Sequence, residues 1–206
     1  MITIRSAEYW ERRYREGGNS GAGSYGRLAG FKADFVNAFI ARYHIASVLD
    51  LGCGDGNLLS LLEVPDYVGV DVSPTALADC SVRFPRHRFV PYSDAAQLPP
   101  AELAMSLDVI YHLVEDAVFA DYIETLFGHA TRFILIYSSN FDAHWPHAHV
   151  LHRRFTDHVL TTQPDWRLLA HVPNRFPYDP HQPDDATSFA DFFVFARNGQ
   201  VAANPP

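Results

Sequence analysis

The segment with the clearest chemical signal joins an apolar run to a glycine-rich turn: Val48-Leu49-Asp50-Leu51-Gly52-Cys53-Gly54-Asp55-Gly56-Asn57. Glycines at every second position let the backbone turn sharply and come close to a ligand, since a Cβ would block the approach or forbid a positive φ. The spacing G-x-G-x-G differs from the dinucleotide fingerprint G-x-G-x-x-G, because Asn57 stands where that pattern needs its third glycine. A fixed carboxylate at Asp50 would repel a pyrophosphate and attract a cation, so the turn predicts a pocket for a positively charged cofactor.

A second acidic residue ends the next apolar run, Tyr67-Val68-Gly69-Val70-Asp71. A carboxylate at the tip of a strand beside a glycine turn can accept hydrogen bonds from both hydroxyl groups of a ribose. S-Adenosylmethionine and NAD both carry a ribose, so Asp71 alone does not separate them. S-Adenosylmethionine also carries an ammonium group and a sulfonium. Asp50 and the glycine spacing therefore make it the predicted cofactor, with Asp50, Gly52 and Gly54 at its aminocarboxylate half.

Three further segments extend this pattern over most of the chain. They are Gly17-Gly18-Asn19-Ser20-Gly21-Ala22-Gly23-Ser24-Tyr25-Gly26, Ser106-Leu107-Asp108-Val109-Ile110-Tyr111-His112-Leu113 and His149-Val150-Leu151-His152-Arg153-Arg154-Phe155-Thr156. With the glycine turn, they make the sequence resemble the class I, Rossmann-like S-adenosylmethionine-dependent methyltransferases. In particular it is similar to small bacterial enzymes often linked to saccharide and secondary-metabolite pathways. The resemblance implies an α/β fold, a Rossmann-like three-layer sandwich with a mostly parallel seven-stranded sheet and an antiparallel C-terminal edge hairpin.

The pattern of apolar runs, turn residues and capping residues agrees with alternating strands and helices. Helices are predicted over residues 6–16, from about 32 to 43, and over 57–63, 74–83, 116–128 and about 155–163. Strands are predicted over residues 47–51, 67–71, 88–92, 103–108, 132–138, 166–172 and 191–197. We expect one domain over residues 1–206, with a helix and glycine-rich lid over 1–31, a Rossmann-like core over 32–200 and a frayed tail over 201–206.

The resemblance implies further cofactor contacts at the strand ends, where ligands of open α/β sheets bind. Val72 would lie against the adenine ring, and Leu107 would line the pocket at the end of the fourth strand. Within Ser93-Asp94-Ala95, Asp94 would accept a hydrogen bond from the adenine amino group. Alternatively, Asp94 is only a turn or N-cap residue.

The loop 17–26 is too rich in glycine to fold against a core, and it is interpreted as a mobile lid that closes over the cofactor and excludes water. Ser24 and Tyr25 are its best candidates for contact, and Trp10 on the preceding helix would pack on the cofactor. The loop could instead be a plain connector, and the aromatic side chains of the helix, which begins with Ser6 as the predicted N-cap, could belong to the core.

His112 and Asp108 are the predicted catalytic residues, because the resemblance places them beneath the transferred methyl group. An alcohol must lose its proton as it is methylated, and a histidine titrates close to neutral pH, so His112 is the leading general base. Asp108 would orient that histidine or bind the substrate. The alternatives are a structural or positioning role for His112 and a solvated acid at position 108.

Four of the eleven histidines fall in the segment His144-Trp145-Pro146-His147-Ala148-His149-Val150-Leu151-His152. Imidazole ligands suit several transition metals, but Pro146 breaks any regular ligand spacing, and no metal site is predicted. We expect substrate contacts instead, from Tyr111, His149, His152 and Arg154. Two alternatives remain: the histidines form a metal-binding module on a nucleotide-binding scaffold, or these side chains cap or cover a surface helix.

Composition excludes several classes of protein. The 206 residues are 48% hydrophobic, enough for one core. The formal net charge is −8, and basic residues cluster only in pairs such as Arg12-Arg13 and Arg153-Arg154, so nucleic acid is not an expected partner. The N-terminal residues lack the apolar stretch of a signal peptide, and no run approaches a membrane span, so we expect a cytoplasmic protein without membrane contact. Cys53 and Cys80 are read as reduced packing residues.

The sequence therefore predicts a methyltransferase for a small polar metabolite. O-methylation of a sugar, nucleotide-sugar or secondary metabolite is the leading hypothesis. N-methylation of an amine is the alternative within the same class, and a non-catalytic partner protein that binds a nucleotide cofactor is the alternative from another class. An oligomer is compatible with the sequence, and the acceptor molecule is not encoded in any transferable motif.

Overall fold

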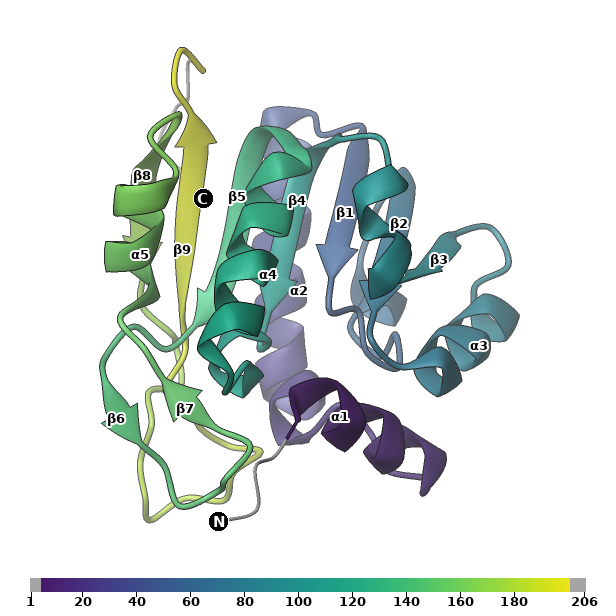
Figure 1. The fold of residues 1–206 in the computed structure, drawn as a ribbon, viewed down its shortest axis with the longest axis vertical. Coiled ribbons are helices and arrows are strands. Elements are labelled where there is room, and N and C mark those ends of the chain that lie inside the picture. Colours follow the sequence, from purple (N-terminus) through teal and green to yellow (C-terminus); the bar gives the residue numbers. More distant parts are fainter. Residues whose placement is uncertain (1–4, 201–206) are drawn as a thin grey trace.

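Seven strands form a single sheet in the computed structural model, which describes residues 5–200. Their order is β3-β2-β1-β4-β5-β9-β8, and β1 to β5 pair in parallel, while β9 runs antiparallel between β5 and β8 (Figure 1). The strands are β1 (Ser47–Leu51), β2 (Asp66–Asp71), β3 (Arg88–Pro91), β4 (Ala101–Leu107), β5 (Ala130–Ser138), β8 (Trp166–Val172) and β9 (Asp191–Arg197). The predicted α/β sandwich with an antiparallel C-terminal edge hairpin is confirmed.

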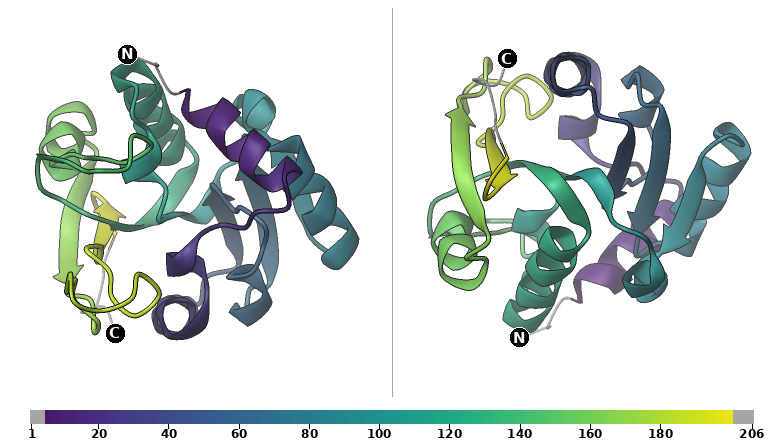
Figure 2. Two further views of the ribbon diagram at one scale, coloured as in Figure 1. Left: turned by 90° about the horizontal axis from the view of Figure 1, so that it is seen from below. Right: turned by 90° about the horizontal axis from the view of Figure 1, so that it is seen from above.

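Helices cover both faces of the sheet, as the views from below and from above show (Figure 2). The α-helices are α1 (Ser6–Arg15), α2 (Gly26–Tyr43), α3 (Pro74–Arg83), α4 (Asp116–Gly128) and α5 (Phe155–Thr162). Alternate residues of β5 divide between the two layers. Phe133 and Leu135 pack in the core with α2, and Ile134 and Ile136 pack in the core with α4 and α5. A strand buried on both faces needs such a continuous apolar sequence, because its side chains alternate in direction.

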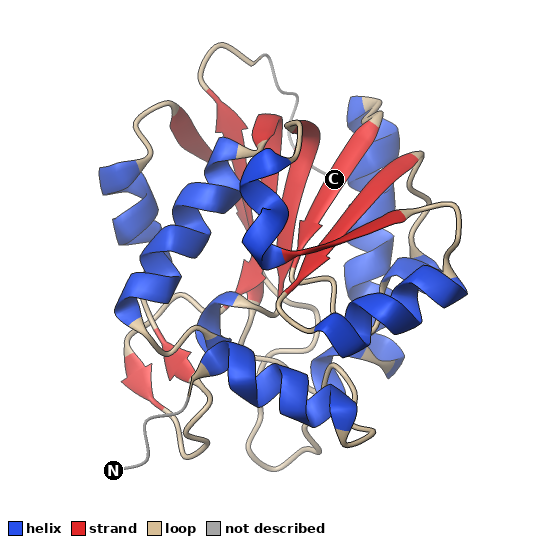
Figure 3. Cartoon of the chain, turned by 45° about the vertical axis from the view of Figure 1, so that its right-hand side comes forward, coloured by secondary structure: helices blue, strands red, loops and turns tan. Residues whose placement is uncertain are grey.

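Helix α1 lies across the edge of the sheet at which the parallel strands end (Figure 3). Two glutamates hold the helix in place through hydrogen bonds. Glu115, before the first turn of α4, accepts a hydrogen bond from the backbone N–H of Ser6 at 2.9 Å. Glu11 accepts from the hydroxyl groups of Ser73 and Thr75 at the start of α3, at 2.7 and 2.8 Å. The helix therefore bridges the beginnings of α3 and α4, above the carboxyl ends of the strands between them.

The N-terminal predictions need two corrections. Ser6 is the first helical residue and not the N-cap, which is Arg5. The Ser6 hydroxyl lies 2.8 Å from the carbonyl oxygen of His112 and so serves tertiary structure. Helix α2 begins at Gly26, six residues before the predicted start, and it crosses the expected boundary between lid and core at residues 31 and 32.

The predicted helix over 57–63 is wrong, since only a 3₁₀ turn forms, η2 (Leu59–Leu61). Two constraints explain this. Gly56 has a φ of 70°, and a Cβ there would lie 2.8 Å from the Phe84 ring, so the chain must leave the glycine turn at a fixed angle close to α3. Pro65 then restricts the residue before it to extended conformations, which leaves too few residues for an α-helix.

The histidine-rich segment contains a short hairpin that the sequence did not predict, formed by β6 (Ala143–His144) and β7 (Leu151–His152). Three further 3₁₀ turns connect elements: η1 (Ala22–Ser24), η3 (Tyr92–Gln97) and η4 (Ile110–His112). The tail predicted at 201–206 lies outside the described residues. Among residues 5–200, no helix combines the length and apolarity needed to cross a bilayer.

The central position of β5 predicts a large effect of a cavity-forming substitution. Ile134 has no exposed surface, so Ile134→Ala should lower the free energy of unfolding by about 3 kcal/mol in urea denaturation. Val82→Ala is the matched control, because Val82 is 82% exposed on α3, and its effect should stay within about 0.5 kcal/mol. Equal effects of the two substitutions would contradict this packing.

Candidate functional site

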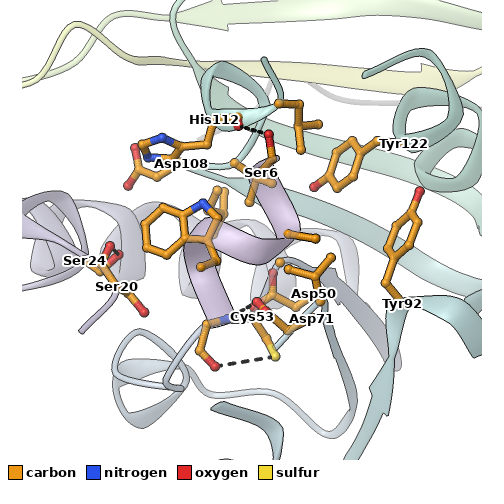
Figure 4. A pocket seen from close by; sticks show the side chains of 18 of the residues that line it. Ser6, Ser20, Ser24, Asp50, Cys53, Asp71, Tyr92, Asp108, His112 and Tyr122 are labelled. Atoms are coloured by element: carbon orange, nitrogen blue, oxygen red, sulfur yellow. Dashed lines mark hydrogen bonds between the residues drawn. The ribbon is translucent and has the colours of Figure 1, made fainter. Parts of the chain in front are cut away.

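A cavity of about 450 Å³ lies between α1 and the carboxyl ends of β1, β2 and β4 (Figure 4). Its floor contains Asp50 and Asp71, and its wall on one side contains Asp108 and His112. On the opposite side lie Tyr92 and Tyr122, whose rings stack with 6.3 Å between centroids. We refer to these two sides as the two arms of the cavity.

The glycine turn can follow its path only without side chains. Gly52 has a φ of 91°, and a Cβ there would lie 2.4 Å from Cγ2 of Val109. Gly54 has a φ of 57°, and a Cβ there would lie 2.4 Å from the Ser20 hydroxyl. Both the conformation and the close approach therefore require glycine. The backbone N–H of Gly54 donates to Asp71 at 2.9 Å, which joins the turn to the end of β2.

Asp50 and Asp71 are buried carboxyl groups at the ends of neighbouring strands. Asp50 accepts a hydrogen bond from the Tyr67 hydroxyl at 2.8 Å, and Asp71 accepts from the backbone N–H groups of Gly54 and Ser73. Burial, together with a smaller effect of the nearby Asp71 carboxyl, raises the pKa of Asp50 to about 7. Burial also raises the pKa of Asp71, against its backbone hydrogen bonds. A cation placed between these groups would stabilise their ionised forms and so offset the free-energy cost of burying them.

The end of β4 carries a buried ion pair. Lys32 on α2 donates from Nζ to the Asp108 carboxylate, whose other oxygen accepts from the Tyr111 hydroxyl at 2.7 Å. Lys32 is 1% exposed, and both charged groups line the cavity. Asp108 has a φ of 63°, which is uncommon for a residue other than glycine, and residues held in such conformations cluster at functional sites.

His112 follows in η4 and faces the same arm of the cavity. Its Nδ1 donates to the carbonyl oxygen of His149 at 3.0 Å, which leaves Nε2 of the neutral ring as the acceptor. Among residues 5–200, the hydrogen bond of this ring is made at Nδ1, so Nε2 is available to a ligand. Burial lowers the pKa of His112 to about 4, so the ring is neutral near pH 7 and is a weaker base than the sequence predicted.

The glycine-rich loop is ordered against the glycine turn. Asp55 accepts hydrogen bonds from the backbone N–H of Ser20 at 2.9 Å and from the Tyr25 hydroxyl at 2.6 Å. The side-chain amide of Asn57 donates to the carbonyl oxygen of Ser24 at 2.7 Å. None of residues 17–26 is buried, so the loop joins no core, in line with its glycine content, and these hydrogen bonds hold it at the cavity beside α1.

The structure brings most of the predicted cofactor and catalytic positions to the cavity wall. Those that line it are Trp10, Asp50, Gly52, Gly54, Asp71, Val72, Leu107, Asp108 and His112. Tyr25 does not line it and reaches it only through Asp55. Ser93 and Asp94 lie outside the wall, and Ala95 is buried in the core. At this strand end, Tyr92 faces the cavity instead.

Three of the four predicted substrate residues pack around η4: Tyr111 belongs to it, and ring contacts join His149 to His112 and His152 to Tyr111. Tyr111 is buried behind Asp108, and the ring of His149 stacks on Tyr9 with 4.4 Å between centroids. His152 is buried, donating or accepting at Nδ1 with Ser139, so it belongs to the packing of the hairpin. Arg154 is exposed and contacts Asp142. None of the four lines the cavity, and residues 5–200 contain no group of three or more potential metal ligands.

Several cavity residues were given no role at the site by the sequence analysis. Ser20, Asp55 and Val109 lie within the motif segments but were not singled out. The others come from segments without a motif and are Ser6, Tyr14, Lys32, Tyr92, Asp121 and Tyr122. Lys32 had a usable signal, since it is the only lysine in the 206 residues and stands among apolar neighbours on an amphipathic helix. The others depend on how distant segments come together.

The cavity wall is acidic. It contains five aspartates, at positions 50, 55, 71, 108 and 121, and among the described residues that line it Lys32 is the one fixed cation. His112 adds no charge near pH 7 because its pKa is lowered. A ligand with positive charge on one part therefore suits this wall better than a polyanion does.

Comparisons with known proteins agree with this geometry. A family model described as a methyltransferase domain matches residues 27–182. Over 94 residues the chain is 37% identical to trans-aconitate 2-methyltransferase of Klebsiella pneumoniae (strain 342), but the match covers 44% of this chain and only 35% of that protein.

Solved structures show the same fold. The N-methyltransferase NodS from Bradyrhizobium japonicum WM9, in complex with S-adenosyl-L-homocysteine, aligns with a TM-score of 0.65 and 14% identity, covering 96% of this chain and 100% of that one. Magnesium protoporphyrin IX methyltransferase from Synechocystis PCC 6803, with bound SAM, aligns with a TM-score of 0.64 and 17% identity, over 96% and 100%. At these identities the likeness concerns the fold alone.

The raised pKa of Asp50 predicts a pH-dependent stability. The folded protein keeps a proton on Asp50 up to about pH 7, whereas the unfolded chain loses it near pH 4, so stability falls as the pH rises through this window. Asp50→Asn cannot ionise. Its free energy of unfolding relative to the wild type should therefore rise by about 1.4 kcal/mol per pH unit between pH 5 and 7.

Urea denaturation at pH 5, 6 and 7 measures this difference. Asp66→Asn, at the exposed opposite end of β2, is the matched control and should show no such trend. A constant difference between Asp50→Asn and the wild type over these pH values would contradict a raised pKa at Asp50.

Proposed function

Because the chain belongs to the methyltransferase domain family whose model matches residues 27–182, we propose that it transfers a methyl group from S-adenosylmethionine to an oxygen atom of a small, hydroxyl-bearing metabolite. Sugars and secondary metabolites are the leading acceptor classes. The observation that carries the proposal is the pair of buried carboxyl groups, Asp50 and Asp71, beside a glycine turn in an acidic cavity.

The residues present fit this cofactor. Asp50 and the backbone of Gly52 and Gly54 would hold the aminocarboxylate part, since a buried carboxyl is complementary to an ammonium group. Asp71 would accept hydrogen bonds from the ribose hydroxyls. The arm that contains the two tyrosines suits a flat adenine ring, and Val72 lines the same cavity.

The other arm is left for the acceptor, with Asp108 and His112 on its wall. When bound, the cofactor would supply an electrophilic methyl carbon on its sulfonium to the acceptor oxygen. His112 takes the hydroxyl proton at its free Nε2 and passes it to water, because a histidine with a lowered pKa does not retain it.

N-methylation of an amine is the second candidate, and two observations favour it. A neutral amine is already a nucleophile and needs no strong base, which agrees with the lowered pKa of His112. The acidic wall would also attract a cationic amine before its deprotonation.

Calorimetric titration tests the cofactor. S-Adenosylhomocysteine should bind at one site per chain, NAD should not bind, and Asp71→Ala should weaken binding at least tenfold, because the ribose loses its acceptor. Asp66→Asn on the same strand is the control. Binding of NAD, or of neither ligand to folded protein, would overturn the proposal, and cofactor binding without turnover over a broad acceptor panel would favour a non-catalytic partner protein.

Turnover tests the role of His112. For a hydroxyl acceptor found in a panel of methyl glycosides with radiolabelled S-adenosylmethionine, His112→Ala should lower kcat by about 100-fold, the lower end of the range for general bases. The wild-type kcat should show no histidine limb between pH 5.5 and 7.5, because the pKa of His112 is lowered to about 4. His181→Ala, at an exposed loop position, is the control. Near-normal turnover by His112→Ala would favour an amine acceptor.

A further inference from the structure

The ion pair of Lys32 and Asp108 contains the only lysine of the chain. The chain has 15 arginines and a single lysine, and that lysine is buried and lines the cavity. A buried charge is costly unless it is paired, and the ammonium group of Lys32 is paired with the Asp108 carboxylate. Lys32 also lies over the ring of Tyr137, with 5.3 Å from Nζ to the ring centroid.

Asp108 is held in place by more than the lysine. Its φ of 63° is one of two positive values among described residues other than glycine, and the second, at His44, ends helix α2 as a common left-handed cap. No helix end explains the conformation of Asp108. The Tyr111 hydroxyl and Lys32 fix its two oxygens, and a Cβ on Gly23 of the lid loop would lie 3.1 Å from the carboxylate. The lid therefore closes directly over this group.

The pair can recognise a hydroxyl group from both sides. The ammonium group of Lys32 has three N–H donors, and Asp108 uses one of them, while the Asp108 carboxylate retains lone pairs beyond the two hydrogen bonds it accepts. A hydroxyl group is both donor and acceptor. It can donate to Asp108 while it accepts from Lys32, and the free Nε2 of His112 lies on the same wall.

Charge makes the same pair selective. The positive charge of Lys32 is neutralised by Asp108, and the other charged groups on the described wall are aspartates. Arg13 does not line the cavity; it lies over the Trp10 ring and donates to the carbonyl oxygen of Asn19. A carboxylate or phosphate at the acceptor position would lose its hydration without gaining a free cation.

We infer that the Lys32–Asp108 pair is the acceptor-binding element of the site, which holds an uncharged hydroxyl group between its two members and rejects acceptors that carry an anion next to the reacting oxygen. The inference rests on the proposed function and narrows its acceptor class. It separates neutral sugars from sugar acids and sugar phosphates.

The single lysine provides a direct observation of this element. Protein labelled with ¹³C at lysine Cε gives one lysine signal, because Lys32 is the only lysine in the sequence. With S-adenosylhomocysteine bound, methyl glycosides of glucose, galactose and mannose are titrated, each beside the glycoside of the corresponding uronic acid. The expected result is a shift of the lysine signal by at least one neutral glycoside, with an affinity at least tenfold higher than that of its uronate.

Two substitutions sharpen the test. Lys32→Met should weaken binding of the neutral glycoside at least tenfold in calorimetric titration. Asp108→Asn leaves Lys32 without its counter-charge, so the affinity for the uronate, divided by the affinity for the neutral glycoside, should rise at least tenfold. Asp34→Asn, exposed on the same helix, is the control. Titration with S-adenosylhomocysteine reports whether each variant keeps its fold and its cofactor site.

A wild-type protein that binds the uronates as tightly as the neutral glycosides, or that binds no neutral glycoside, would overturn the inference without any variant. Failure of S-adenosylhomocysteine to bind the wild type would instead overturn the proposed function.

Discussion

Aspartates taken out of water at the ends of β1, β2 and β4 are the constraint on which the rest of the structure depends. Each needs a donor that the fold must supply: the Tyr67 hydroxyl for Asp50, backbone N–H groups for Asp71, and Lys32 with Tyr111 for Asp108. Parallel pairing brings the three strand ends to one edge of the sheet. The glycine turn, the start of α3 and the buried face of α2 can all be understood as means of keeping these carboxyl groups in place.

The pattern of apolar and polar residues predicted those helices and strands whose first and last residues are marked by polar or turn residues in the sequence itself. Helix α4 and strands β8 and β9 have the predicted bounds, because an uninterrupted apolar pattern ends at polar or turn residues at both sides. Asp50 and Asp71 could be placed at the cavity for the same reason, since a strand followed by a turn fixes which end of the sheet its last side chain reaches. The predicted helix over 57–63 failed because its limits come from Phe84 and Pro65, not from its own apolar pattern.

Contacts between distant segments could not be predicted from one sequence. The partner of Asp108 is 76 residues away on α2, and the partner of Ser6 is 109 residues away at α4. Asp94 shows the same limit at short range, since a motif identified the strand end but not which of its neighbouring side chains faces inward; Tyr92 does so and Asp94 is exposed. Side-chain direction in a 3₁₀ turn depends on tertiary packing, which a motif does not encode.

The position of α1 has a consequence for the order in which the protein takes shape during synthesis. Helix α1 is synthesised before the other described elements, yet both glutamate contacts that hold its first turn and its middle involve α3 and α4, and Glu115 is made more than a hundred residues after Ser6. Until α3 and α4 have been made, α1 cannot cover the carboxyl ends of the strands that form the floor of the cavity. Closing so long a loop costs entropy that only the completed sheet can offset, so the ligand site is among the last parts of the nascent chain to form.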